Sequence, residues 1–456
     1  MKQKPELLMP AGDLEKAKFA IAFGADAVYA GVPVFALRSK ENKINFDNLK
    51  ELVDYVHEKN KKIYLTINIY AHNSKLKPLT NTIDKMIALK PDAFIVSDPG
   101  IIELIIDKCE KNKIPIHLST QANTTNWASV KFWQRNGVSR IILARELTLK
   151  EIAEIRKENP NIELETFIHG SMCMSYSGRC LLSNFMTGRD ANQGTCAQNC
   201  RWNYKIHESE KEGLLKDITK IKDIQESQRH DKSSDGKKYF LEEKLRPGEF
   251  IPIEEDDFGT YFMSSRDLCA VEFIPKLIEL KIDSLKVEGR NKSLYYASIV
   301  ARVYRKLIDD IFEGKKTDID WAFEELQSTG NRGFMPGFFL GDLQQNSTRY
   351  DSNQFLQTHT YVGTIKTSKN EKEYFIEIDV KNRLDKNDEL EIISPKENFF
   401  VKITNMSLSE EKVTTIHPGQ GIGKISITKE LYDRLNKYSF LVSRIKGSQK
   451  TSKKKS

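Results

Sequence analysis

Short apolar runs alternate with amphipathic stretches along most of the chain. The runs are rich in aliphatic and β-branched residues, and they lie at 6–9, 25–30, 62–68, 92–98, 115–120, 140–144, 164–169 and 283–288. Between most of them, for example at 14–23 and 46–58, apolar residues recur at helical spacing. This alternation of strand and helix predicts a parallel sheet with helical crossovers.

The number of predicted strands decides between two α/β architectures. Eight strands is the number that closes a (β/α)8 barrel. An open doubly wound sheet would alternate in the same way, but it usually uses fewer strands. The pattern therefore favours an α/β fold with a (β/α)8 TIM-like barrel, formed by residues 1–204 and 259–345.

Two segments depart from the alternation. Residues 205–258 are mostly polar and contain few aromatic residues, so we predict a polar insertion between the seventh and eighth strands. Residues 358–443 read as short strands separated by turn signals, which predicts a small C-terminal β-barrel domain. Barrels of this kind serve as RNA or protein docking modules, and a stabilising appendage is an equal alternative.

Charge and hydropathy say more about the location of the protein in the cell than about its substrate. The net charge is +7, but residues 446–456 alone carry five lysines and no acid, in a basic tail that we place at 444–456. Such a tail suits a solvated terminus, and it would also be attracted to RNA. The chain has neither an apolar run near the roughly 20 residues that span a bilayer nor an N-terminal signal peptide pattern. We therefore expect a cytoplasmic protein without a membrane partner.

The cysteines are the strongest chemical signal. Six, fifteen and three residues separate Cys173, Cys180, Cys196 and Cys200, and Cys269 follows much later. In a reducing cytosol such clustering favours metal binding over disulfides. Zinc sites usually contain paired, closely spaced cysteines, whereas only one close pair occurs here, so an iron–sulfur cluster fits better. The remaining alternative is that several of these cysteines are small core residues.

The position of these cysteines also matters. They follow the seventh predicted strand, and loops after strand ends form the active-site face of a (β/α)8 barrel. We predict Cys173, Cys180 and Cys196 as three ligands, and either Cys200 or Cys269 as the fourth.

Polar residues at the ends of the predicted strands suggest a binding pocket. Glu165 and His169 lie four residues apart on one strand, so they should share a face. There they could bind substrate or transfer protons, or simply orient each other in the barrel core. Seven further residues are predicted to line the pocket: Asn68, Asp98, Gln121, Asn123, Arg145, Glu288 and Arg290. The arginines would suit a carboxylate substrate, because a guanidinium can bind it through two hydrogen bonds.

One stretch carries a family signature. Its matching positions are Glu165, Phe167, Gly170, Ser171, Met172, Cys173, Gly178, Cys180, Leu182 and Ser183. With these residues the chain resembles peptidase family U32, and the similarity extends over most of residues 5–345 and into the C-terminal β segment. Within that family it looks most like the proteins that help to make 5-hydroxyuridine at the wobble position of tRNA.

The resemblance implies more than the residues alone. It implies tRNA as a partner, prephenate as a co-substrate, and a 4Fe-4S cluster on Cys173, Cys180 and Cys196 with Cys200 or Cys269. The family name also implies collagenase-like proteolysis, although neither an HExxH nor a GxSxG motif is present. A non-catalytic scaffold of a hydroxylase complex is a further alternative.

Overall fold

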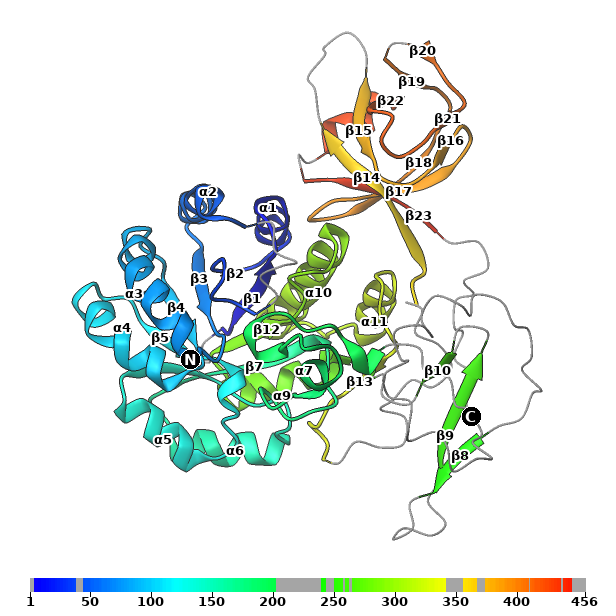
Figure 1. The fold of residues 1–456 in the computed structure, drawn as a ribbon. Coiled ribbons are helices and arrows are strands. Elements are labelled where there is room, and N and C mark those ends of the chain that lie inside the picture. The colour runs from blue at the N-terminus through cyan, green and yellow to red at the C-terminus, as the bar shows by residue number, and fades with distance from the viewer. Residues whose placement is uncertain are drawn as a thin grey trace, which may run out of the picture.

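A barrel and a C-terminal β domain make up most of the molecule (Figure 1). The computed structural model describes residues 4–37, 44–201, 239–242, 250–256, 259–261, 265–341, 356–366, 374–409, 411–435 and 438–444.

Eight parallel strands form a closed ring. They are β1 (Glu6–Ala11), β2 (Ala27–Gly31), β3 (Lys62–Ile67), β4 (Ala93–Val96), β5 (Ile116–Leu118), β6 (Val138–Ile142), β7 (Glu163–Ser171) and β12 (Ser284–Val287). Each strand pairs with the next, and β12 closes the ring by pairing with both β7 and β1. The predicted barrel and all eight predicted strands are confirmed.

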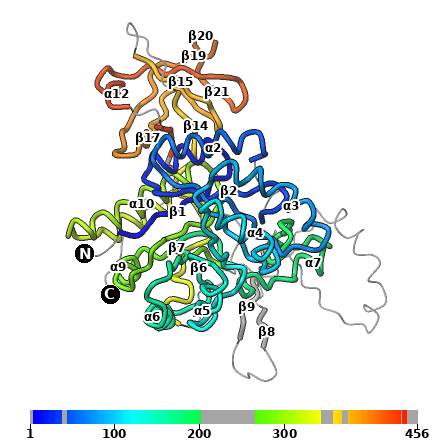
Figure 2. Tube along the Cα trace, turned by 90° about the vertical axis from the view of Figure 1, so that its left-hand side faces the viewer, coloured from blue at the N-terminus to red at the C-terminus, as the bar shows by residue number. Residues whose placement is uncertain are grey.

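Helices cover the outside of the ring, so the strands are buried on both faces (Figures 1 and 2). They are α1 (Leu14–Ala22), α2 (Phe46–Glu58), α3 (Asn73–Ala88), α4 (Pro99–Lys111), α5 (Trp127–Arg135), α6 (Leu149–Glu158), α9 (Ile274–Glu279), α10 (Leu294–Phe312) and α11 (Ile319–Gln327). Polar residues begin several of them: the side chains of Asp13, Asp98 and Ser293 accept hydrogen bonds from backbone N–H groups of the first turn.

Strand β7 continues past the barrel and carries two extra strands on its rim. β11 (Asp267–Cys269) pairs antiparallel with the end of β7, and β13 (Phe334–Met335) pairs parallel with β11. These strands have three and two residues, too few for a periodic pattern to reveal. The pairing with β11 holds the end of β7 in place, and the cysteine-bearing loop begins directly after that end.

The predicted insertion at 205–258 falls largely outside the described residues. Its described part and the residues just after it form a three-stranded antiparallel sheet of β8 (Tyr239–Glu242), β9 (Phe250–Asp256) and β10 (Gly259–Tyr261). The described part of the insertion therefore consists of regular strands. The predicted basic tail lies outside the described residues from 445 onward.

The C-terminal domain is an antiparallel sheet that curves as a half-barrel (Figure 1). Its strands are β14 (His359–Lys366), β15 (Phe375–Val380), β17 (Glu389–Ile393), β18 (Asn398–Lys402), β19 (Met406–Leu408), β20 (Glu411–Lys412), β22 (Ile422–Ser426) and β23 (Phe440–Arg444). A short pair, β16 (Leu384–Asp385) and β21 (Thr415–Ile416), and the helix α12 (Lys429–Arg434) complete it. The predicted β domain is confirmed.

This domain packs on α1 and α10 of the barrel. The Phe440 ring lies 5.7 Å from that of Phe23 and 5.5 Å from that of Tyr295, measured between centroids. Arg302 on α10 donates to the carbonyl of Ser394 at 3.1 Å. Aromatic packing and a buried arginine therefore join the two parts.

No helix in the described ranges combines the length and apolar character needed to cross a membrane.

Candidate functional site

A cavity of about 180 Å³ opens at the C-terminal ends of the barrel strands. Its wall includes Thr66 from β3, Ile95 from β4, Ile142 from β6, Phe167 from β7 and Lys286 from β12. Most of the ring therefore contributes to one hollow, at the face where barrel enzymes place their active sites.

The cysteine-bearing loop forms the outer wall of this cavity. Cys173, Cys180 and Cys196 all line it, Cys173 being exposed and the other two half-buried. The described part of the loop also contains the short helix α7 (Leu182–Thr187) and two 3-10 turns, Ala191–Gln193 and Asn199–Arg201. Cys173, Cys180 and Cys196 therefore lie at the C-terminal face of the barrel.

Glycine determines how closely the loop approaches the barrel. Gly178 has a φ of +75°, and a Cβ there would lie 2.1 Å from the carbonyl oxygen of Gln121. Hydrogen bonds then hold the rest of the loop: Asn192 donates to the carbonyl of Cys180 at 3.2 Å, and Ala197 donates to Ser183 Oγ at 2.8 Å. The cysteines are thus held by a loop with its own internal hydrogen bonds.

The two candidates for the fourth ligand lie in different surroundings. Cys200 is half-buried on the Asn199–Arg201 turn of the same loop. Cys269 is buried on β11, with its Sγ 3.9 Å from the hydroxyl of Tyr304. Burial raises the pKa of the Cys269 thiol to about 12. Neither residue is part of the cavity wall.

The cysteines at the cavity supply the donor atoms that an iron–sulfur cluster needs. Thiols are the right type of donor for an iron–sulfur centre, and three of them share one cavity. Across the described ranges, no three histidine, cysteine, aspartate or glutamate side chains lie close enough together to hold one metal ion. The residues fit an iron–sulfur cluster in kind and in location. Their sulfur atoms would have to move closer to one another to bind it.

Glu165 and His169 do not share a face, which corrects the prediction from their spacing. The ladder between β7 and β12 shifts register after Lys286, so that Phe167 and His169 face consecutive residues of β12 and Ile168 is extra. Such a β-bulge reverses the alternation of side chains beyond it. As a result Glu165 points into the barrel, whereas His169 points outward.

His169 lies in a buried aromatic cluster outside the ring. Its Nδ1 is 3.2 Å from the hydroxyl of Tyr304, and its ring packs against Tyr296 and Phe334. Burial, aided by the positive charge of Lys292, lowers the pKa of His169 to about 3. The imidazole is therefore neutral and is not among the residues that line the cavity.

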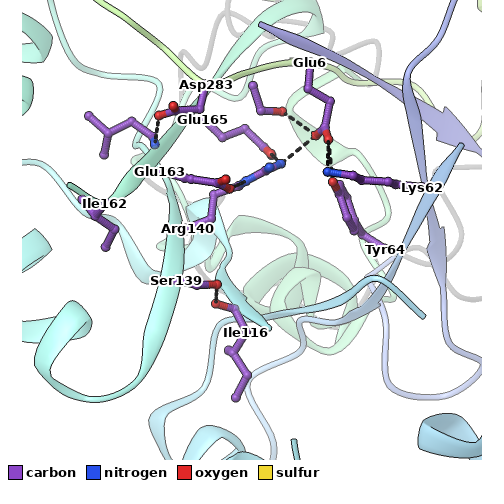
Figure 3. Close-up of polar contacts among 12 residues, drawn as sticks. Glu6, Lys62, Tyr64, Ile116, Ser139, Arg140, Ile162, Glu163, Glu165 and Asp283 are labelled. Atoms are coloured by element: carbon purple, nitrogen blue, oxygen red, sulfur yellow. Dashed lines mark hydrogen bonds and ion pairs between the residues drawn. The ribbon is translucent and has the colours of Figure 1, made fainter. Parts of the chain in front are cut away.

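Glu165 belongs to a buried network of charges within the barrel. Its carboxylate accepts from Lys286 Nζ at 2.8 Å and from Arg140 Nη1 at 3.2 Å. Arg140 also binds Glu6 and Glu163, each at 2.7 Å, so its guanidinium lies among three carboxylates (Figure 3). Burial disfavours the charge on Glu165, but Lys286 and Arg140 outweigh it and lower the pKa of the carboxyl.

Lys286 is a charged cavity residue that was not among the predicted site residues, and Glu146 is another. Lys286 is 4% exposed and lines the cavity, and its ammonium group lies 4.6 Å from the centre of the Tyr29 ring. Burial lowers its pKa, and the neighbouring Glu165 opposes this shift. A lysine between Leu285 and Val287 in a predicted strand, two residues before Glu288, was the signal that could have revealed it.

Most of the predicted binding residues lie at the cavity. Its lining includes Asn68, Gln121, Arg145, Glu288 and Arg290. Asn123 and Asp98 are not part of the lining. Asn123 adopts a left-handed conformation that ends the turn at Thr120–Ala122, and Asp98 caps α4 and accepts from the N–H of Ala71 at 3.1 Å.

The two arginines are held by the backbone around them. Arg145 donates from Nη1 to the carbonyl of Ser171 at 2.7 Å and stacks 3.9 Å from the centre of the Phe167 ring. Arg290 donates to Thr66 Oγ1 at 3.1 Å and to the carbonyl of Leu37 at 2.5 Å. These contacts fix each guanidinium at the wall of the cavity.

Two buried polar atoms of this wall have no partner among the described residues. They are Arg145 Nε and Glu146 Oε2, although the other carboxylate oxygen of Glu146 accepts from Ser177 N at 2.8 Å. Buried polar atoms without partners are rare in folded proteins. Arg145 Nε could donate to a polar ligand and Glu146 Oε2 could accept from one, in a wall that carries three cationic side chains together with the carboxylates of Glu146 and Glu288.

The comparisons with known proteins agree on one family. The sequence profile of peptidase family U32 matches residues 12–349, and that of the peptidase family U32 C-terminal domain matches residues 357–435. The "tRNA hydroxylation protein P" of Haemophilus influenzae is 42% identical over 426 residues, which is 92% of each chain. Its namesake in Escherichia coli is 40% identical over 423 residues, again 92% of each chain.

A solved structure, that of the U32 peptidase Mk0906, aligns with a TM-score of 0.31 at 14% identity, over 36% of this chain and 69% of that one. The profile match extends over well over half of the chain, and the two curated relatives match almost its full length. The chain therefore belongs to peptidase family U32.

Proposed function

We propose that this protein is an RNA-modifying enzyme that forms 5-hydroxyuridine at the wobble position of tRNA. The observation that carries the proposal is the cavity, in which three thiols and three cationic side chains meet on the active-site face of the barrel. Two relatives that match nearly the whole chain at 42% and 40% identity are named tRNA hydroxylation protein P. An RNA substrate is therefore the first class to test.

The chemistry demands a redox group. Replacing the C5–H of uracil by C5–OH is a two-electron oxidation, so the reaction needs an oxygen donor and an acceptor for two electrons from outside the chain, and a redox group at the site to pass those electrons on. We propose that Cys173, Cys180 and Cys196 hold a 4Fe-4S cluster, with Cys200 or Cys269 as the fourth ligand. When bound, such a cluster supplies one-electron transfer. The chain itself contributes the thiolates and a loop that keeps them at the cavity.

The cationic wall suits a small organic acid. We propose that prephenate, a dicarboxylate, binds as co-substrate between Arg145, Arg290 and Lys286. Guanidinium groups bind carboxylates through paired hydrogen bonds, and the ammonium of Lys286 adds charge where water is largely excluded. Gln121 and Glu288 line the same cavity and would orient the hydroxyl group of such an acid. Compared with the set predicted from the sequence, the proposed binding set gains Lys286 and loses Asn123.

The proposal is tested in a strain that lacks the gene. We expect mass spectrometry of its tRNA to show loss of 5-hydroxyuridine and of the nucleosides made from it. Wild-type protein should restore them, and Cys173→Ser protein at equal abundance should not. Unchanged tRNA in a strain without a second relative would contradict the proposal.

Purified protein and the Cys173→Ser variant also test two alternatives to this proposal, proteolysis and a non-catalytic scaffold. Proteolysis predicts peptide cleavage by purified protein that depends on His169, yet this imidazole is buried outside the ring, away from the cavity wall. A non-catalytic scaffold predicts that Cys173→Ser protein still restores the modification. Either result would replace the enzymatic proposal.

A further inference from the structure

The loop that carries the cysteines exposes an unusual number of large apolar side chains. Five of them lie between residues 174 and 186, and we call them the rim patch: Met174, Tyr176, Leu181, Phe185 and Met186. Phe185 is 91% exposed and Tyr176 is 65% exposed. Contiguous apolar residues at a protein surface commonly mark an interaction site.

The rim patch adjoins the cavity. Tyr176 itself lines the cavity, and the patch residues are interleaved with the cavity residues Cys173 and Cys180. The short helix α7 then presents Phe185 and Met186 to solvent. A macromolecule that placed one of its groups in the cavity would thus rest its neighbouring groups on the patch.

The charge around the patch selects the kind of partner. Residues 171–201 contain three arginines, one aspartate, no lysine and no glutamate, which gives a net charge of +2. Arg179 and Arg189 are exposed. Arg189 is anchored by hydrogen bonds to the carbonyls of Thr195 at 3.0 Å and Cys196 at 3.3 Å. No ion pair in the described ranges neutralises either arginine.

We propose that the rim patch is the stacking platform for RNA bases beside the target nucleotide, with Arg179 and Arg189 facing the phosphates. The inference rests on the proposed function and extends it to a binding surface. Aromatic side chains among exposed cations are the means by which proteins hold single-stranded RNA, because every base offers a flat face for stacking. An apolar protein partner would use the same aromatic residues but would have no need for an uncompensated positive charge.

Binding of an unmodified tRNA transcript with uridine at the wobble position tests the platform. We expect Phe185→Ala and Tyr176→Ala in the full-length protein to weaken binding about tenfold each, which lies within the range for the loss of stacking on one base. Phe185→Trp should bind as wild type does. The matched control is Phe132→Ala on α5, a 49% exposed aromatic residue far along the sequence from the loop, which should change nothing.

The arginines give an independent readout. We expect Arg179→Ala to reduce the slope of log affinity against log salt by about 0.7, the value for one phosphate contact on a single strand. Iron content and thermal unfolding, measured for every variant, show whether the loop itself is intact.

The outcomes separate the two proposals. If wild-type protein binds the transcript and both alanine variants bind within twofold of it, the platform is overturned, whereas the proposed function stands. Capture of a protein partner that these variants lose, with RNA binding unchanged, overturns the platform in the same way. If the wild-type protein neither binds nor modifies tRNA, both proposals fail together.

Discussion

The ammonium group of Lys286 has the cavity on one side and the Glu165 carboxylate on the other. The pair is buried, since Lys286 is 4% exposed and Glu165 is fully buried. Buried ion pairs contribute little on balance, but the loss of one partner leaves an uncompensated charge at a large cost. At the residue scale, the barrel interior is thus a set of charges that depend on one another.

A double-mutant cycle tests this dependence. We expect Lys286→Met to lower the free energy of unfolding by about 3 kcal/mol, because Glu165 loses its closer partner. Lys286→Met combined with Glu165→Gln should recover a large part of that loss. Urea unfolding of the four proteins gives the coupling energy. A Lys286→Met protein as stable as wild type would show that the pair is not coupled.

His117 gives the barrel a sensitivity to acid. It is buried on β5 beside Tyr64, and its Nδ1 has no hydrogen-bond partner in the part of the chain described. Burial, together with the charges of Arg140 and Lys286, keeps the pKa of His117 well below its usual value. The folded state therefore binds fewer protons than the unfolded state below about pH 6.5, so stability falls as the pH decreases through this range.

Replacing His117 by phenylalanine should remove that loss. At pH 5.5 we expect the wild type to have lost about 1 kcal/mol relative to the variant, compared with their difference at pH 7.5. Urea unfolding at the two pH values is the measurement. Parallel pH profiles for the two proteins would show that His117 is protonated in the folded state as readily as in the unfolded chain.

At the scale of elements, the cysteine loop is positioned by its glycines. Gly178 and Gly188 both adopt positive φ, +75° and +66°. A side chain at Gly178 would collide with the backbone of Gln121, whereas no atom lies within 4 Å of a Cβ at Gly188. A side chain would thus strain the backbone at both positions, but it would collide with a neighbouring segment only at Gly178.

Alanine at these positions separates the two effects. We expect Gly188→Ala to cost about 1 kcal/mol from strain alone and to leave the iron content unchanged. Gly178→Ala should cost more and should also lower the iron content, because the loop must move away from the barrel. Thermal unfolding and iron analysis of anaerobically purified protein give both readouts. Equal behaviour of the two variants would contradict the importance of the contact with Gln121.

The two candidates for the fourth cluster ligand lie on different elements, because Cys200 belongs to the loop and Cys269 to β11. A 4Fe-4S cluster held by four thiolates needs only one of them. We expect one of the two single serine variants to lose most of its iron and the other to retain it, with the double variant matching the first. Iron and sulfide analysis with visible absorption measures this. Full iron in the double variant would refute a four-cysteine site, as would zinc in the wild-type protein.

Structure that a local sequence pattern causes could be predicted from the sequence, whereas structure that depends on distant residues could not. All eight barrel strands were predicted, because their runs of aliphatic residues are themselves the cause of burial. The bulge at Ile168 depends on β11, β12 and α10, since its carbonyl accepts from both Tyr304 and Ala270 at 2.9 Å. No spacing within β7 contains that information, so His169 was assigned to the wrong face.

At the scale of the whole molecule, one aromatic residue lies at the centre of the contact between the C-terminal domain and the barrel. Phe440 on β23 is fully buried and contacts Phe19 on α1, Phe23 at the end of that helix and Tyr295 on α10. Tyr438 adds a hydrogen bond between its hydroxyl and that of Tyr55 on α2 at 2.7 Å. The residues that meet here come from opposite ends of the chain, which is why composition and periodicity reveal the domain but not its docking.

Removing that ring should loosen the domain as a unit. We expect Phe440→Ala to lower the free energy of unfolding by about 4 kcal/mol, in the range for a buried phenylalanine. The C-terminal domain should then unfold before the barrel, in a separate transition. Phe400→Ala in the same domain is the matched control, because Phe400 is 80% exposed and its loss should change stability by less than about 0.5 kcal/mol.

Calorimetry combined with limited proteolysis measures the unfolding of the barrel and of the C-terminal domain separately. Early cleavage confined to the C-terminal domain of the Phe440→Ala protein would support the prediction, since a domain held mainly by this contact exposes its own backbone once the contact is gone. A single cooperative transition at the wild-type temperature would contradict it.

Because His359 and Tyr361 of β14 lie beside Lys292 and Tyr296 at the edge of the barrel, a loosened domain should also weaken tRNA binding if the RNA extends over both parts. An unchanged affinity would confine the RNA contacts to the barrel.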